Sequence, residues 1–169
     1  MNKDKSSIMG LLEKLGHWMM ADPEEYGYSE DKIAEITKQA RGKSVTQASL
    51  LGQSHEPLTV IENLQEGEQP HYCIPVSGFE MEGIGQETEG GAGRFVVTEE
   101  RIILNRKKGI SASTTTVDYD SIEAVELAEG FLHTRLTLHT KSGSFSVKSA
   151  ESEWGDEMEN ARETIQEFR

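Results

Sequence analysis

The chain has 169 residues, of which 17 are basic and 30 acidic, so its formal net charge at pH 7 is −13. Its mass of 18.8 kDa allows one ordinary domain with an appendage and excludes two full domains. The acidic balance argues against a nucleic-acid partner, which would need a basic surface, and no apolar run reaches the roughly 20 residues of a membrane span.

Residues 1–56 are predicted to form an N-terminal helical extension that ends in a linker. Its first element is an amphipathic helix over residues 6–20, because apolar side chains recur there at three- and four-residue spacing. Pro23 is expected to end this helix, since proline disfavours the helical conformation of the residue before it.

A second helix is predicted over residues 29–41, with Gly42 as its C-terminal stop. Residues 43–56 are rich in serine, glutamine and glycine, which predicts a linker. The main domain is therefore expected to occupy residues 57–169.

Beyond a short helix predicted over residues 57–67, the apolar period changes from 3.6 to 2, which predicts about seven short antiparallel strands. These are expected near residues 71–76, 94–98, 101–105, 114–119, 122–127, 132–138 and 145–147. Pro75 favours an edge position or a bulge for the first strand, and the glycine-rich residues 83–93 predict a loop. The residues of the sixth strand that are expected to face inward are Leu132, Thr134, Leu136 and Leu138.

The C-terminal segment has the clearest helical pattern in the chain. Five apolar side chains recur at spacings of four and three residues and share one face, namely Trp154, Met158, Ala161, Ile165 and Phe168. The opposite face is expected to lie in solvent, and it carries Glu153, Asp156, Glu157, Glu159, Glu163 and Glu167. Such a helix must cover an apolar surface, and the open end of a small bent sheet is the natural place for it.

Three segments of the chain resemble the bacterial pleckstrin-homology (PH) domain family, in particular its YokE-like branch. They are LQEGEQPHYCIPV at residues 64–76, GRFVVTEERIILNRKKG at residues 93–109, and VDYDSIEAVELAEGFLHTRLTLHTKSG at residues 117–143. The resemblance implies an α+β fold in which a small bent β-barrel is capped by the C-terminal helix. It also implies a binding scaffold whose ligand is a lipid headgroup, a protein or a peptide, without deciding among them.

The sequence offers two weak candidates for chemistry. His71 and Cys73 would share one face of a strand, but no orienting acid or oxyanion donor can be assigned to them, and packing is the favoured interpretation. His133, Arg135 and His139 would form a stripe on another strand, which is interpreted as a solvent-facing polar side. No metal-ligand spacing or cofactor motif is recognised, so we expect neither a metal, a cofactor nor catalytic residues.

Arg106, Lys107 and Lys108 form the one basic cluster, and they are expected on a loop between two strands. They are the candidates for contact with an anion or a lipid. The residues of the first predicted helix that are candidates for an interaction surface are Leu11, Leu12, Leu15 and Trp18.

The sequence therefore predicts a non-catalytic, cytoplasmic module for protein–protein interaction or self-assembly, most simply a homo-oligomer. The alternative is a peripheral membrane protein that binds anionic lipid through the first helix and the Arg106–Lys108 cluster. A first helix that simply packs on the barrel is an equally open interpretation.

Overall fold

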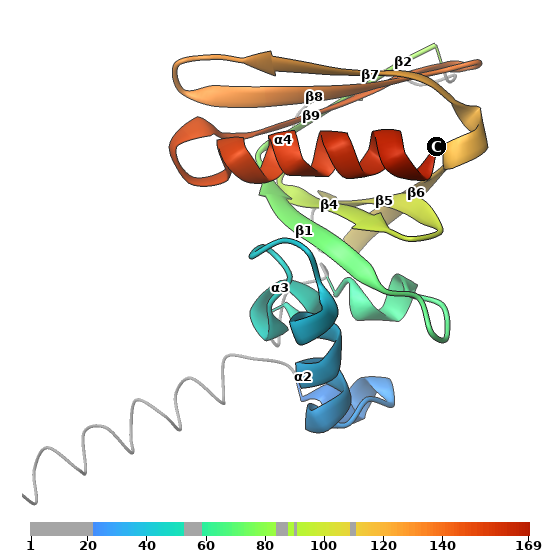
Figure 1. Ribbon diagram of the computed structural model, residues 1–169, viewed down its shortest axis with the longest axis vertical. Helices are drawn as coiled ribbons and strands as arrows, with labels where there is room; N and C mark the ends of the chain where they lie inside the picture. The colour runs from blue at the N-terminus through green and yellow to red at the C-terminus, as the bar shows by residue number, and fades with distance from the viewer. Residues whose placement is uncertain (1–21, 53–58, 84–87, 90, 109–110) are drawn as a thin grey trace, which may run out of the picture.

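The computed structural model describes residues 22–52, 59–83, 88–89, 91–108 and 111–169. Within these ranges, nine strands form two antiparallel sheets, and a long C-terminal helix lies between them (Figure 1). The strands are β1 (Pro70–Val76), β2 (Gly78–Glu82), β3 (Thr88–Glu89), β4 (Gly93–Thr98), β5 (Arg101–Lys108), β6 (Ser111–Asp118), β7 (Ile122–Glu129), β8 (His133–Thr140) and β9 (Gly143–Ala150). The helices are η1 (Pro23–Tyr26), α2 (Glu30–Gln39), α3 (Gln47–Leu51), η2 (Ile61–Asn63), η3 (Tyr119–Ser121) and α4 (Glu151–Phe168), where η denotes a 3-10 helix.

The two sheets have the strand orders β1-β4-β5-β6 and β3-β2-β9-β8-β7. The chain passes from the first sheet to the second at Ser77, whose backbone N–H donates to the Lys148 carbonyl at 2.8 Å. The predicted hairpin at Glu99-Glu100 is present, with Val97 of β4 opposite Ile102 of β5. The expected fold, a bent antiparallel barrel with a C-terminal helix, is confirmed, although nine strands replace the seven or so expected.

The extra strands come from a region without an apolar alternation. β2 pairs with β9 and with the two-residue β3, which lies inside residues 83–93, the stretch that we expected to be a glycine-rich loop. Only Phe79 in β2 is fully buried, while Glu80 and Glu82 lie toward solvent, so the segment has too few buried side chains to give a strand signal.

The interior of the barrel is formed by alternate residues of both sheets, among them Phe95, Leu136 and Phe145. α4 closes this interior between the two sheets, and Met158, Ala161 and Ile165 on its inner face are inaccessible to solvent. The side chains at the two ends of this face, Trp154 and Phe168, are partly buried and pack against the same core. None of the helices in the described ranges combines the length and apolar character needed to cross a membrane.

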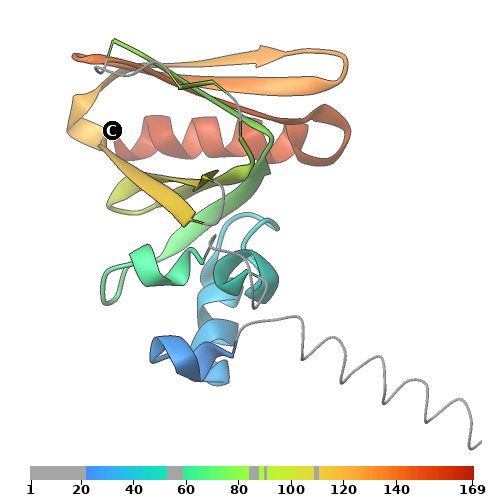
Figure 2. The same cartoon turned by 180° about the vertical axis from the view of Figure 1, so that it is seen from behind.

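The outer face of the four-stranded sheet is also buried. Cys73, Val96 and Ile103 form a second apolar cluster with residues of the N-terminal segment and the residue before η2, namely Ile36, Val45, Leu50 and Val60. Figure 2 shows this helical layer beneath the sheet. Burial on both faces explains why β4 and β5 have consecutive apolar residues instead of an alternation.

The prediction of a linker over residues 43–56 is wrong for residues 43–52. This stretch contains α3, which begins with a capping box in which the Thr46 and Ser49 side chains accept from each other's backbone N–H at 3.1 and 2.8 Å. Leu50 and Leu51 are completely buried. Burial of these two leucines holds in place a segment whose polar composition predicts a linker.

Gly42 does not stop α2, which begins after the Ser29 cap and ends at Gln39 with an extended residue. Gly42 instead allows a close approach between chain segments. A Cβ atom at this position would lie 2.5 Å from Cδ1 of Tyr72 and 2.6 Å from Oε2 of Glu157, so only glycine fits. Its N–H donates to the carbonyl of His71 at 2.9 Å, which joins the N-terminal segment to the edge of β1.

Glu68 anchors the loop between η2 and β1 to the β4–β5 hairpin. Its buried carboxylate accepts from Nε and Nη2 of Arg101, each at 3.0 Å, and from Oγ1 of Thr98 at 2.7 Å. Burial alone would raise the pKa of Glu68, but the hydrogen bonds from Arg101, the Gln65 N–H and Thr98, together with the charge of Arg101, outweigh it. The net result is a pKa below the usual range for glutamate.

We predict that Glu68→Gln lowers the free energy of unfolding by roughly 1–3 kcal/mol at pH 7, because it weakens a charged, buried hydrogen-bond network. A lowered pKa in the folded state contributes stability above the pKa of the unfolded chain, near 4.5, and this contribution is lost as the pH falls through the folded-state pKa. Urea unfolding across pH should therefore show the difference from wild type shrinking in acid. Glu66→Gln, at an exposed position nearby, should change little, and an equal effect of both substitutions would contradict the assignment.

Candidate functional site

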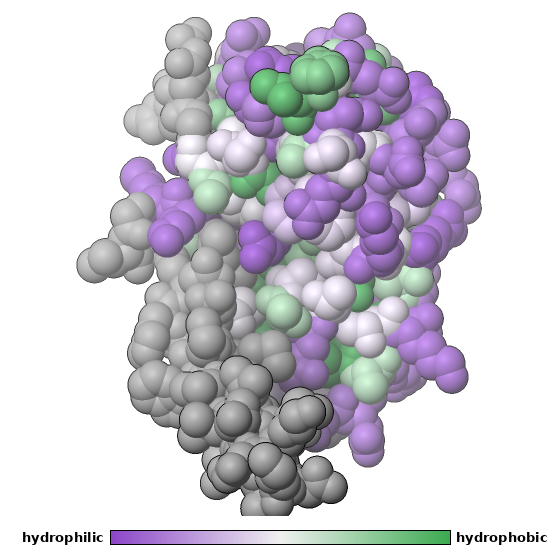
Figure 3. Space-filling view, turned by 90° about the vertical axis from the view of Figure 1, so that its left-hand side faces the viewer, coloured by the Kyte–Doolittle hydropathy of each residue, from purple (hydrophilic) through white to green (hydrophobic). Residues whose placement is uncertain are grey.

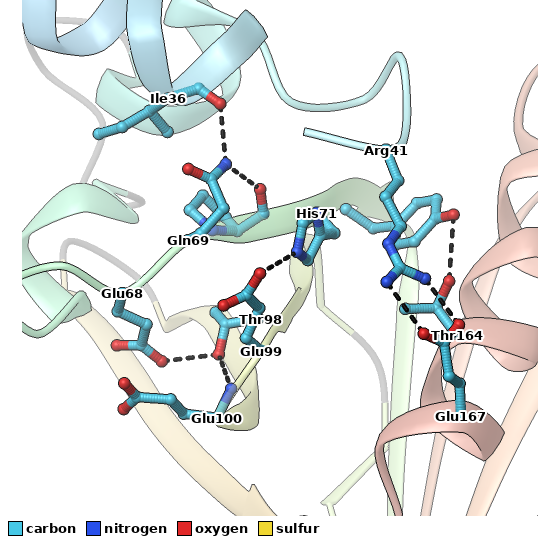
Figure 4. A network of polar contacts seen from close by, with 12 residues as sticks. Ile36, Arg41, Glu68, Gln69, His71, Thr98, Glu99, Glu100, Thr164 and Glu167 are labelled. Carbon is cyan, nitrogen blue, oxygen red and sulfur yellow. Dashed lines mark hydrogen bonds and ion pairs between the residues drawn. The ribbon is translucent and has the colours of Figure 1, made fainter. Parts of the chain in front are cut away.

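A polar network joins α4 to the N-terminal segment at the edge of β1 (Figure 4). Arg41 donates to both carboxylate oxygens of Glu167 at 2.8 and 3.1 Å, and its guanidinium lies 5.0 Å from the centre of the Phe168 ring. The hydrogen bond with Glu167 raises the pKa of Arg41, and the same bond lowers the pKa of Glu167. This network holds the C-terminal end of α4 against the N-terminal segment.

Glu157 corrects the prediction that the acidic face of the last helix lies entirely in solvent. Its carboxylate is buried and accepts from the backbone N–H groups of Lys43 at 2.9 Å and Ser44 at 3.2 Å. It therefore satisfies two backbone donors of a segment more than one hundred residues away in sequence.

His71 and Cys73 do not act as a pair. His71 Nε2 lies 3.1 Å from Oε1 of Glu99, whereas the Cys73 thiol donates to the Ser49 carbonyl at 3.5 Å inside the second apolar cluster. Burial raises the pKa of Cys73 to about 11, so the thiol stays protonated at neutral pH. Both side chains hold neighbouring segments together, which agrees with the packing interpretation.

The basic cluster lies on a strand and not on a loop, which corrects its expected position. Arg106, Lys107 and Lys108 are the last residues of β5, paired with residues 111–113 of β6. Lys107 and Lys108 are exposed, and none of the three makes an ion pair with another described residue.

The stripe of His133, Arg135 and His139 lies on the solvent side of β8, as expected. Two of its members are paired with carboxylates of the same sheet: Arg135 with Glu80 of β2, and His139 with Glu126 of the adjacent strand β7 at 2.7 Å. The stripe therefore offers little free positive charge for an anion.

A shallow hollow of about 370 Å³ lies beside the Arg135–Glu80 pair on the outside of the five-stranded sheet. Ser146 and Lys148 also line it, so it is polar and open. In the described ranges, no three histidine, cysteine, aspartate or glutamate side chains gather as metal ligands.

The two exposed large apolar side chains of the described ranges lie together at the turn between β7 and β8. Phe131 is 97% exposed and Leu132 is 67% exposed, although Leu132 was expected to face the interior. Figure 3 shows apolar residues gathered at the end of the molecule where this turn lies. β8 begins at His133, so Leu132 belongs to the turn, and the strand's inward alternation starts only at Thr134.

The sequence prediction missed this site because it began the sixth strand at Leu132, one residue before β8, and so placed a turn residue in the alternation. The available signal was Gly130, which stands immediately before the two apolar residues. A Cβ atom at Gly130 would lie 2.7 Å from the His133 carbonyl oxygen, so the turn needs glycine there. Leu11, Leu12, Leu15 and Trp18, the candidates in the first predicted helix, lie outside the described residues.

Comparison with known proteins supplies the family. The model of the family described as bacterial PH domain matches residues 64–166, without distinguishing the YokE-like branch. Among solved structures, the Vps36 N-terminal PH domain is similar, with 18% sequence identity and a TM-score of 0.48 over 62% of this chain and 83% of that chain. No curated protein sequence matches at the significance required. Because the family match covers more than half of its length, this chain belongs to the bacterial PH domain family.

Proposed function

We propose that this chain is a non-catalytic module that binds another protein in the cytoplasm. The observation that carries the proposal is the exposure of Phe131 and Leu132 at the turn between β7 and β8. We call Gly130, Phe131 and Leu132 the β7–β8 tip. An aromatic ring that is almost fully exposed gains free energy when a partner buries it, and such rings are frequent anchors of protein interfaces.

The β7–β8 tip is held in position before any partner arrives. The Gly130 N–H donates to the His133 carbonyl at 2.8 Å, which closes the turn. The Glu151 N–H at the start of α4 donates to the Leu132 carbonyl at 3.0 Å, which ties the turn to the helix. A rigid anchor loses little conformational entropy on binding, so this geometry supports recognition by a preformed surface.

The charges around the tip indicate the chemistry of the partner. Glu129 precedes it, and Glu151 and Glu153 on the first turn of α4 lie on the segment bonded to Leu132. A partner that fits would offer an apolar pocket with a basic rim. The same carboxylates oppose contact with an anionic membrane, which favours a protein over a lipid at this surface.

We predict that Phe131→Ala removes binding of the partner while it leaves the fold intact. The side chain has almost no contacts to lose, so the free energy of unfolding should stay within about 0.5 kcal/mol of wild type. The measurement is cross-linking in cells from a photoreactive residue at exposed Glu129, beside the tip, with and without Phe131→Ala; one at exposed Ser142 in the β8–β9 turn is the control. A discrete protein captured only at position 129, and lost in Phe131→Ala, is expected. Capture that persists in Phe131→Ala, or the same captured set from both positions, would contradict the proposal.

The peripheral-membrane alternative is tested separately. We predict weak sedimentation with anionic vesicles, unchanged when Lys107→Glu and Lys108→Glu are combined, because two lysines face a protein with a net charge of −13. The control is the chain without residues 1–21. Tight vesicle binding that is lost in the lysine variant and kept in the shortened chain would favour a lipid-binding domain over a protein-binding one.

Self-association is the second part of the proposal. The candidates Leu11, Leu12, Leu15 and Trp18 stay a prediction for a homo-oligomer, which deletion of residues 1–21 tests by its effect on the mass in solution. The cytoplasmic location is proposed from composition, since a single cysteine in 169 residues gives no internal disulfide.

A further inference from the structure

The two sheets of the described structure end in four edge strands, and three of these edges are protected. Hydrogen bonds occupy the outer side of β1. The His71 carbonyl accepts from the Gly42 N–H, and the Cys73 N–H donates to Oγ of Ser44 at 3.0 Å. The Pro75 carbonyl accepts from Oγ of Ser149 at 2.7 Å. The edge of β1 therefore has little capacity to pair with another chain.

The edges of the five-stranded sheet are protected in other ways. β3 has only two residues, which is too short to hold a partner strand. β7 carries three exposed glutamates, Glu123, Glu126 and Glu129, and its register shifts between Ile122 and Ala124. Charged side chains and irregular register are the usual means by which proteins keep an edge strand from pairing.

β6 has none of these protections. Its eight residues, Ser111–Asp118, pair with β5 without a register shift, and they contain no proline and no charge before Asp118. In the described part of the chain, no backbone group hydrogen-bonds to the edge of β6 that faces away from β5. Thr114 Oγ1 contacts Oδ1 of Asn63 at 3.3 Å. Figure 2 shows β6 on the outside of the four-stranded sheet, descending from η3.

The charges at the two ends of β6 are opposite in sign. At one end, Lys107 and Lys108 of β5 stand opposite residues 112 and 111 of β6, and both lysines are exposed. At the other end lie Asp118 and Asp120, which are also exposed. Between them the strand carries no charged residue and is rich in threonine.

We propose that β6 is the interface for a second copy of this chain, paired antiparallel about a two-fold axis at Thr115. Antiparallel pairing brings the basic end of each copy beside the acidic end of the other, which makes the edge self-complementary. With Ala112 opposite the partner's Asp118, Lys107 lies two strand spacings, about 10 Å, from that residue. Lys107, Ala112 and Asp118 all lie on the outer face of the sheet, so their side chains share one side of the paired strands. Long side chains span this separation, which is comparable to the Debye length.

The pairing would join two four-stranded sheets into one continuous sheet of eight strands across the dimer. Threonines opposite each other across antiparallel strands pair favourably, and a self-complementary charge pattern selects a second copy over an unrelated strand. This interface goes beyond the partner proposed for the β7–β8 tip and does not depend on Phe131.

The test uses two charge-reversal variants of the full chain in sedimentation equilibrium. Wild type should approach twice 18.8 kDa as its concentration rises. Lys107→Glu with Lys108→Glu places acid against acid in a homodimer, and Asp118→Lys with Asp120→Lys places base against base, so each variant should dimerise at least tenfold more weakly. An equimolar mixture of the two restores opposite charges at both ends and should recover the dimer.

Two controls keep the test decisive. Thr116 lies at an exposed central position of β6, and Thr116→Lys should give a monomer with the circular dichroism spectrum of wild type. This variant tests the β6 interface even if a charge-reversal variant fails to fold. A wild-type chain that stays near 18.8 kDa at every concentration, or a dimer that survives Thr116→Lys and both charge variants, would overturn the proposal. A dimer that is lost only on deletion of residues 1–21 would place the interface there instead. None of these results bears on binding through Phe131.

Discussion

The four-stranded sheet is apolar on both faces, and this constraint shapes the rest of the molecule. Residues such as Ile74 and Phe95 point into the barrel, where α4 and the second sheet cover them, while Cys73, Val96 and Ile103 point outward. A sheet of this kind is stable only between two covering layers. The N-terminal segment is therefore part of the folded unit in its described residues 22–52, and Gly42 and Glu157 are the contacts that bring it against β1 and α4.

Covering one side of the sheet determines which surfaces remain for binding. The segment that supplies the outer layer also occupies the edge of β1, so the opposite edge, β6, is where the sheet can extend. The β7–β8 tip lies on the other sheet, so a partner bound there and a second copy at β6 would use different strands. A binding module with two separate surfaces can join a partner protein to a dimer, which is a common arrangement for scaffolds.

The sequence allowed the class of fold to be predicted, because strand alternation and helical spacing are local signals. The β4–β5 hairpin and the inner face of α4 are examples. It did not reveal the second layer, although the consecutive apolar residues FVV and IIL already indicated strands buried on both faces. Burial of Glu157 could not be predicted locally, because its partners at residues 43 and 44 meet it only in the folded chain. The exposed β7–β8 tip was missed because an alternation of apolar residues does not show at which residue a turn ends and a strand begins.

Amide hydrogen exchange measures the two edges of the four-stranded sheet separately. We predict that the Cys73 amide, bonded to Ser44, exchanges slowly at every protein concentration. Outward amides of β6 should exchange rapidly in dilute solution and become protected as the concentration rises. Rapid exchange of Cys73 would contradict the covered edge, and β6 amides whose protection does not change with concentration would contradict the open one.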